Sequence, residues 1–132
     1  GTVYKKFSDV PFTGQVEGRY QGSLKNGLRE GSWVGYHEKG QLGSKGDYKN
    51  GLREGSWVGY HENGQLSAKA DYKNGKAEGS WVSYWDNGQL QHKGAYKNGE
   101  KEGSWESYDK DGSVSVFYMF TGTFKDGVKI SD

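Results

Sequence analysis

The sequence of 132 residues contains no cysteine and one proline, and hydrophobic residues make up only 31% of it. Without cysteine there is no disulfide framework and no thiolate chemistry, and the chain fits a reducing or an oxidising compartment equally. The hydrophobic fraction lies below the roughly 45 to 50% of typical globular domains, which argues against a thick two-layer core. Aromatic residues, at 15%, are too frequent for a disordered linker. We therefore expect a thin, ordered fold.

Long hydrophobic runs and a dominant charge are also missing. No run approaches the roughly 18 apolar residues of a membrane span, and the first residues, Gly1 to Tyr4, lack a signal-peptide pattern. We expect a soluble chain of unknown compartment, with any leader absent from this sequence. Eighteen Lys and Arg residues against 17 Asp and Glu residues give a net charge of +1, with the two signs interleaved. Nothing in this pattern calls for nucleic acid, and we predict no nucleic-acid partner.

The sequence does contain a repeat of 24 residues, marked by Trp33, Trp57, Trp81 and Trp105. Around the first three, the chain repeats Gly-Ser-Trp-x-x-Tyr, then Gly-Gln-Leu, then Tyr-Lys-Asn-Gly. Such a unit is too small to bury a core alone, so stability must come from stacked repeats. We expect one repeat domain over 1–132, comprising a degenerate N-terminal cap (1–30), three near-complete repeats (31–102) and a divergent C-terminal repeat and cap (103–132).

Two series of turn signals alternate along the repeats. One series is Lys39-Gly40, Asn63-Gly64, Asn87-Gly88 and Asp111-Gly112, and the other is Asn26-Gly27, Asn50-Gly51, Asn74-Gly75 and Asn98-Gly99. Asn-Gly between alternating apolar and polar residues is the strongest short hairpin signal, because a type I′ turn needs positive φ at both central residues. The sequence therefore predicts an all-β fold, a single-layer twisted antiparallel meander with two strands per repeat.

Two-residue turns in both series fix a strand register. The Lys39-Gly40 turn pairs His37 with Leu42, Gly35 with Ser44 and Trp33 with Gly46, and the Asn50-Gly51 turn pairs Tyr48 with Arg53 and Ser44 with Trp57. This register places every Trp on one face, together with Leu42, Ser44, Gly46 and Tyr48, and places Val34, Tyr36, Lys45 and Asp47 on the other. Each of Trp33, Trp57 and Trp81 meets a small residue across its hairpin, Gly46, Ala70 or Gly94, which leaves room for an indole on the neighbouring strand.

The candidate binding residues are the aromatic side chains of this arrangement. The aromatic stripe, predicted to bind a partner, comprises Trp33, Tyr48, Trp57, Tyr72, Trp81, Trp85, Tyr96 and Trp105. A second row on the opposite face comprises Tyr36, Tyr60, Tyr84 and Tyr108. The rings of the stripe suffice as the thin core of a single sheet. Any part that stays exposed forms an apolar patch of the kind that contacts a protein, a peptide or a lipid.

The end of the chain departs from the repeat. Phe12-Thr13-Gly14 recurs as Phe120-Thr121-Gly122, and residues 114–120 are the most hydrophobic stretch of the sequence. This stretch runs four residues longer than the repeat predicts. We expect a longer or bulged closing strand, because exposed edges need cover against aggregation.

Repeated polar residues do not form a catalytic pattern. His37 and His61 share an offset in adjacent repeats and should lie roughly 10 Å apart, too far to share a metal. An active site needs unlike groups in one unique geometry, and four equivalent glutamates do not supply it. We interpret the glutamates Glu30, Glu54, Glu78 and Glu102 and the lysines Lys45, Lys69, Lys93, Lys49, Lys73 and Lys97 as a solvated, charge-paired surface. We predict no enzyme activity, no cofactor and no metal site.

The repeat resembles a known family. Gly55-Ser56-Trp57-Val58-Gly59-Tyr60-His61-Glu62-Asn63-Gly64-Gln65-Leu66 is similar to the MORN repeat, specifically its bacterial variant in YwqK-type antitoxin proteins, and the similarity spans about residues 10–127. The resemblance implies a bacterial protein and a meander of β-hairpins with an aromatic groove. It also implies a scaffolding role, or an antitoxin-like role in which a toxin is the partner.

Three classes of function remain open. The first is a non-catalytic interaction or scaffolding module that presents its aromatic face to a protein, a peptide or a second copy of itself. The second is binding to a membrane surface or a phospholipid headgroup through Lys and aromatic residues, which should be salt-sensitive. The third is carbohydrate or cell-wall binding by the aromatic stripe.

Overall fold

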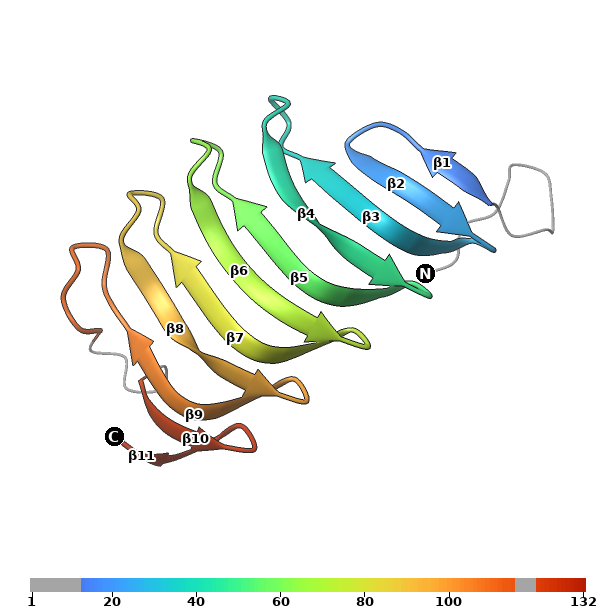
Figure 1. Ribbon diagram of the computed structural model, residues 1–132. Helices are drawn as coiled ribbons and strands as arrows, with labels where there is room; N and C mark the ends of the chain where they lie inside the picture. The colour runs from blue at the N-terminus through green and yellow to red at the C-terminus, as the bar shows by residue number, and fades with distance from the viewer. Residues whose placement is uncertain (1–12, 116–120) are drawn as a thin grey trace.

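The computed structural model describes residues 13–115 and 121–132, and these residues form one open antiparallel sheet of 11 strands without a helix (Figure 1). The strands are β1 (Gly14–Val16), β2 (Tyr20–Lys25), β3 (Leu28–Tyr36), β4 (Leu42–Lys49), β5 (Leu52–Tyr60), β6 (Leu66–Lys73), β7 (Lys76–Tyr84), β8 (Leu90–Lys97), β9 (Glu100–Ser107), β10 (Gly122–Lys125) and β11 (Val128–Ser131). Each strand pairs with its neighbours in the chain. The predicted antiparallel meander with two strands per repeat is confirmed.

Type I′ turns close one edge of the sheet, at the lower right of Figure 1, which we call the turn edge. Asn50 has φ 51° and Gly51 has φ 80°, and the Asn-Gly pairs at 26, 74 and 98 repeat these values within a few degrees. Asparagine enters this left-handed region at lower cost than most residues because its short side chain bonds locally. The two-residue turns predicted for this series are confirmed.

Three-residue loops close the opposite edge, which we call the loop edge. The His37 N–H donates to the Gln41 carbonyl and the Gly40 N–H donates to the His37 carbonyl, both at 2.8 Å. Gly40 has φ 91°, whereas Lys39 does not have positive φ. A type I turn followed by a left-handed glycine is the common three-residue hairpin. The two-residue turns predicted for this series, and the pairing of His37 with Leu42, were therefore wrong.

A one-residue bulge at Gly43 offsets the longer loop. Tyr36 pairs with Leu42, but Gly35 pairs with Ser44, so Trp33 still faces Gly46 as predicted. The bulge moves Leu42 to the face of Tyr36 and away from the predicted Trp face, since residues directly opposite each other share a face. The same bulge in the next two repeats places Leu66 on the face of Tyr60 and Leu90 on the face of Tyr84.

A second irregularity places two extra residues, Gly55 and Ser56, in β5. Asp47 pairs with Glu54 and Lys45 pairs with Val58, and Gly55 takes φ 73° between them. Ser44 consequently faces Gly59, and the predicted pairing of Ser44 with Trp57 was wrong. An insertion of two residues keeps the alternation of faces, so Trp33, Trp57, Trp81 and Trp105 share one face as predicted. We call this surface the Trp face and the other the Tyr face.

Glutamate side chains join successive repeats along the turn edge. Oε2 of Glu30, Glu54 and Glu78 accepts the backbone N–H of Asn50, Asn74 and Asn98 at 2.7, 2.9 and 2.6 Å, and Oε2 of Glu102 accepts that of Asp126 at 3.0 Å. All four glutamates are partly buried. The two ion pairs within residues 13–115 and 121–132, Lys110–Asp86 and Lys129–Asp132, do not include them. The interpretation of the glutamates as a charge-paired surface was therefore wrong.

The ends of the sheet are described in part. Tyr108 forms a bridge with Val114, and β10 pairs with β9 so that Gly122 faces Trp105. Phe12, Phe120 and most of the closing strand expected over 114–120 lie outside the described residues.

Candidate binding face

The indole rings of the Trp face lie over glycines of the preceding strands. A side-chain carbon at Gly22, Gly46 or Gly94 would overlap Cδ2 and Cε2 of Trp33, Trp57 or Trp105 respectively. Each of these indoles is buried, with exposed fractions of 4, 7 and 2%. Close approach of a ring to the backbone therefore requires glycine at these three positions. The glycine beneath each indole belongs to the strand before it, and not to the strand across its own hairpin as predicted.

The same three indoles are fixed by hydrogen bonds to the backbone. Nε1–H of Trp33, Trp57 and Trp105 donates to the carbonyls of Ser23, Asp47 and Ala95, each at 3.0 Å. These contacts satisfy the one polar group of a buried indole. The three rings are therefore structural parts of the sheet and are sealed from solvent.

Cationic side chains cover the outer side of the same rings. Cζ of Arg29 and Arg53 lies 4.6 and 4.5 Å from the ring centres of Trp33 and Trp57, and Nζ of Lys101 lies 4.8 Å from that of Trp105. These distances are typical of cation–π contacts. We call each pair of cation and indole a rung. The rungs were not predicted from the sequence. The predicted pairing of Tyr48 with Arg53, which is confirmed, nevertheless indicated that the arginine lies on this face.

Tyrosine rings separate the indoles along the face. Tyr48 makes edge-on contacts with Trp33 and Trp57, with distances between ring centroids of 6.2 and 5.0 Å. Tyr96 makes similar contacts with Trp81 at 5.5 Å and with Trp105 at 5.1 Å. Tyr72 is the exception, since it has no such ring contact in the described part of the chain. The ladder of rings is therefore interrupted between Trp57 and Trp81.

The third repeat differs from the others at Trp81. Ala70 faces Trp81 where the other repeats have glycine. Trp81 is partly exposed, and its Nε1–H has no acceptor among the described residues. Ala77 occupies the position of Arg29, Arg53 and Lys101 in the other repeats, so that the Trp81 ring has no cation over it in residues 13–115 and 121–132.

A groove opens at this interruption. Its volume is ≈200 Å³, and it is lined by Ser44, Arg53, Trp57, Val58, Gly59, Ala68, Ala70, Tyr72 and Trp81. The equivalent groove one repeat earlier, between Trp33 and Trp57, has a volume of ≈80 Å³. The wider groove gives the predicted stripe space for a ligand between two of its indoles.

Trp85, the remaining member of the predicted stripe, lies elsewhere. It follows the end of β7 at the loop edge, and its Nε1–H donates to the Tyr108 carbonyl at 2.9 Å. His37 and His61 make the equivalent bond to the carbonyls of Tyr60 and Tyr84, each at 2.8 Å. These side chains join the loop of one repeat to the next. Within the described segments, no three His, Asp or Glu side chains are grouped to hold a metal ion.

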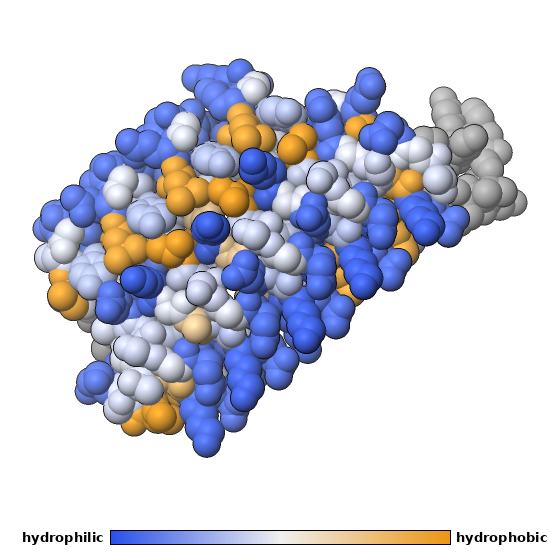
Figure 2. Space-filling model, in the orientation of Figure 1, coloured by the Kyte–Doolittle hydropathy of each residue, from blue (hydrophilic) through white to orange (hydrophobic). Residues whose placement is uncertain are grey.

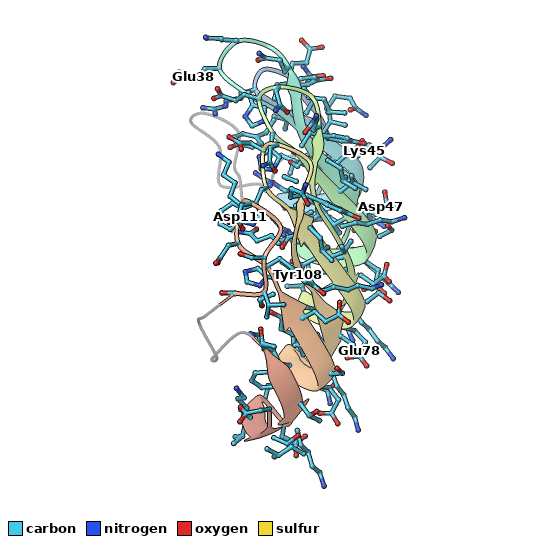
Figure 3. All side chains as sticks on the ribbon, turned by 90° about the vertical axis from the view of Figure 1, so that its left-hand side faces the viewer. Glu38, Lys45, Asp47, Glu78, Tyr108 and Asp111 are labelled. Carbon is cyan, nitrogen blue, oxygen red and sulfur yellow. The ribbon has the colours of Figure 1, made fainter. Side chains whose placement is uncertain are left out.

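The Tyr face is mixed in character. Lys45 and Asp47 point to the same side of the sheet (Figure 3), and Lys45 lies opposite Val34 and Val58. The second row, Tyr36, Tyr60, Tyr84 and Tyr108, is partly buried at the loop end of its strands. Figure 2 shows hydrophobic groups in a band across the face, between hydrophilic groups at the rim of the loop edge and hydrophilic groups toward the turn edge. This face does not present a continuous apolar surface.

A larger groove of ≈550 Å³ lies at the loop edge beside β3. Two of its polar side chains are already engaged, since Arg19 Nε–H donates to the Tyr36 carbonyl at 2.8 Å and His37 bonds to the Tyr60 carbonyl. These groups bind backbone and are not poised for chemistry. None of the described residues forms a helix that is long and apolar enough to cross a membrane.

Comparison with known proteins identifies the family to which the repeats belong. No curated protein matches the chain significantly. The MORN repeat variant family matches residues 29–50, 53–74 and 77–98, which together make up half of the 132 residues. Each matched segment contains one loop and one indole of the Trp face, and ends at the asparagine of a type I′ turn. The chain therefore belongs to the MORN repeat variant family.

Proposed function

We propose that this chain is a non-catalytic interaction module that binds a protein or a peptide through its Trp face. The observation that carries the proposal is the ≈200 Å³ groove between Trp57 and Trp81, which is wider than the ≈80 Å³ groove between Trp33 and Trp57. Its lining of indole, phenol and small side chains around one arginine is typical of the centre of a protein interface. A finer, antitoxin-like proposal names a toxin protein as the partner, and it rests on the family resemblance alone.

A peptide-display selection tests this proposal. Random peptides are selected on the immobilised chain, and affinities of the recovered peptides are measured by fluorescence anisotropy. Ala68→Glu places a carboxylate in the groove, whereas Lys69→Glu changes the next residue of β6, which faces the other side. We expect the first variant to weaken binding at least tenfold and the second to leave it unchanged. Equal effects of the two variants, or no peptide above background, would rule the proposal out.

A second copy of the chain is the alternative occupant of the same face. Sedimentation equilibrium of the wild type and Ala68→Glu distinguishes this case. A dimer that dissociates only in the variant identifies the partner as the chain itself, whereas a monomer in both samples directs attention to an outside partner.

A phospholipid surface is a second candidate function, and the exposed lysines of the Tyr face favour it. Lys45, Lys69, Lys93, Lys49, Lys73 and Lys97 are all exposed. Asp47 and Asp71 lie among them, which weakens the positive field. Co-sedimentation with phosphatidylserine vesicles at low and high salt tests this candidate. Carbohydrate binding is less well supported, because three of the four indoles of the Trp face are buried and offer no free ring surface to a sugar.

A further inference from the structure

The rung at Arg53 provides an internal template for the groove. The Arg53 guanidinium lies over Trp57, and its Nη1–H donates to the Tyr72 hydroxyl at 3.3 Å. Tyr48 lies directly opposite Arg53, and its hydroxyl accepts a hydrogen bond from Arg29 of the preceding repeat at 3.1 Å. Burial acts to lower the pKa of Arg53, but the hydroxyls of Tyr48 and Tyr72 outweigh it and the net shift is upward. One guanidinium thus lies over an indole, between two tyrosines, and donates to the hydroxyl of the second.

One repeat further, the same frame is present without its cation. Ala77 lies opposite Tyr72, as Arg53 lies opposite Tyr48. Trp81 takes the place of Trp57, and Tyr96 takes the place of Tyr72. Burial raises the pKa of the Tyr96 hydroxyl, and the neighbouring Tyr72 hydroxyl raises it further. Tyr96 contacts the Trp81 ring, with 5.5 Å between ring centroids, and Tyr72 lines the same groove as Trp81, so that the two tyrosines flank an indole with no described cation over it.

The volumes of the two grooves agree with this correspondence. Each residue that lines the narrower groove has a counterpart 24 residues later, and nearly all of these counterparts line the wider groove. Arg53, which lines the narrower groove from the Trp57 side, corresponds to Ala77. Tyr20, which also lines the narrower groove, corresponds to the smaller Ser44 in the wider one. The space gained in the wider groove is therefore largely the space that an arginine and a tyrosine side chain fill in the narrower one.

We propose that the space over Trp81, between Tyr72 and Tyr96, binds the guanidinium of an arginine side chain that a protein partner supplies. This proposal rests on the proposed function and names the chemistry of its ligand. Arginine fits better than lysine, because its planar fork can donate to two hydroxyls at once while it stacks on the indole. The chain itself uses lysine in only one of the described rungs, that of Lys101 over Trp105. There the second tyrosine is replaced by Phe124, which has no hydroxyl, and the Phe124 ring centre lies 5.0 Å from Lys101 Nζ.

The neighbouring charges do not prevent this binding. The nearest cations on the face, Arg53 and Lys101, lie one repeat away on either side, and equivalent rungs are separated by two strands, or about 10 Å. Arg29 and Arg53 already coexist at that spacing around the narrower groove. Physiological salt screens exposed charges over about 8 Å. A third guanidinium therefore continues an arrangement that the chain itself contains.

N-acetyl-arginine amide is the probe, and N-acetyl-citrulline amide, which has nearly the same shape without the charge, is its control. Binding to the full chain is followed by the NMR signals of the indole N–H groups. We expect arginine amide to shift the Trp81 signal saturably in the millimolar range, and citrulline amide to bind at least fivefold more weakly. Equal shifts by the two compounds, or shifts spread equally over all the indoles, would overturn the proposal.

Ala77→Arg supplies the missing side chain from within the chain. We expect this variant to remain folded, to melt at a higher temperature than the wild type, and to lose the response to arginine amide. Ala95→Arg is the matched control, since it adds the same charge to β8 on the Tyr face, at the position of Asp47 and Asp71. It should bind the probe like the wild type. Undiminished binding by a folded Ala77→Arg variant contradicts the proposal.

The two proposals can fail separately. If display selection yields peptides that bind the Trp face but tolerate Ala77→Arg, the interaction module stands and the arginine site is wrong. If arginine amide binds as expected but no peptide is selected, the site exists and the proposed function is wrong.

Discussion

The indole of Trp57 lies over the bare Cα of Gly46, and its Nε1–H donates to the carbonyl of the next residue, Asp47, at 3.0 Å. Trp33 on Gly22 and Trp105 on Gly94 repeat this relationship. A sheet with no second layer must cover its own backbone, and a flat indole on glycine does so with the ring that buries the most apolar area. The glycine and the tryptophan are therefore one structural unit shared by adjacent strands.

Gly46→Ala should lower the free energy of unfolding by about 1–3 kcal/mol, because the new methyl group forces the Trp57 ring off its strand. Urea unfolding measures the loss. Gly43→Ala on the same strand is the control, since a side-chain carbon there meets its nearest neighbour, the Gly35 carbonyl oxygen, at 3.4 Å. If the two variants lose equal stability, close packing of the indole is not the reason for the glycine.

Trp57→Ala should cost about 3–5 kcal/mol, the range for a large buried aromatic residue. Trp81→Ala should cost distinctly less, because Trp81 is partly exposed, lacks the backbone hydrogen bond of the other indoles and has no cation above it. Thermal and urea denaturation of the two variants compare them directly. Equal losses would mean that Trp81 is as much a part of the core as Trp57.

The repeat pattern predicts most of this fold, because hairpin turns and alternation are local signals. The Asn-Gly turns and the pairs Trp33 with Gly46 and Tyr48 with Arg53 follow from them. Near the loop edge the prediction fails. The extra residue of the three-residue loop and the extra residue of the Gly43 bulge compensate each other, so the pairing beyond the bulge is as predicted. Only the residues between the loop and the bulge, such as Leu42 and its equivalents, change face. Sequence alone does not distinguish a short turn from a longer turn with a compensating bulge.

The candidate site is harder to predict than the fold. The aromatic positions follow from the period, but their exposure depends on what lies beneath and above each ring. The replacement of Gly46 by Ala70 and of Arg53 by Ala77 in the next repeat is visible in the sequence. Its effect on exposure can be recognised only when the indole is known to pack on the preceding strand. The glutamates were misread for a similar reason, since their partners are backbone groups about 20 residues away.

Glu54→Ala should destabilise the chain by about 1–2 kcal/mol, because the carboxylate accepts the backbone N–H of Asn74 in the next type I′ turn. Glu62→Ala is the control, since Glu62 is an exposed residue of the loop edge with the same side chain. Hydrogen exchange of the Asn74 amide should accelerate in the first variant alone. An unchanged exchange rate would show that the turn does not depend on this bond.

Protonation of His92 should lower the stability of the chain as the pH falls below about 6.5. Burial lowers the pKa of its imidazole, and the nearby Lys101 lowers it further. The folded-state pKa therefore lies below the value of about 6.5 in the unfolded chain, so that the unfolded state binds protons first. The contribution of His92 is complete above this value and is lost as the pH falls toward the folded-state pKa.

Urea midpoints of the wild type and His92→Gln at pH 7.5 and pH 5.5 measure this effect. We expect the difference between the two pH values to be smaller in the variant, whereas His61→Gln should keep the wild-type difference. If His92→Gln retains the whole pH dependence, protonation of another group is responsible.

Arg53→Ala should create a second arginine site by emptying a rung that the chain normally fills itself. Tyr48 and Tyr72 would then face each other over an uncovered Trp57, as Tyr72 and Tyr96 do over Trp81. We expect N-acetyl-arginine amide to shift the Trp57 indole N–H signal in this variant, and Arg53→Lys to show no such shift. The indole of Trp57 should stay on Gly46, because its seat and its Asp47 bond do not involve the arginine. If Trp57 does not respond in a folded Arg53→Ala variant, an empty rung is not enough to bind a guanidinium, and the partial exposure of the Trp81 ring must itself be part of the site.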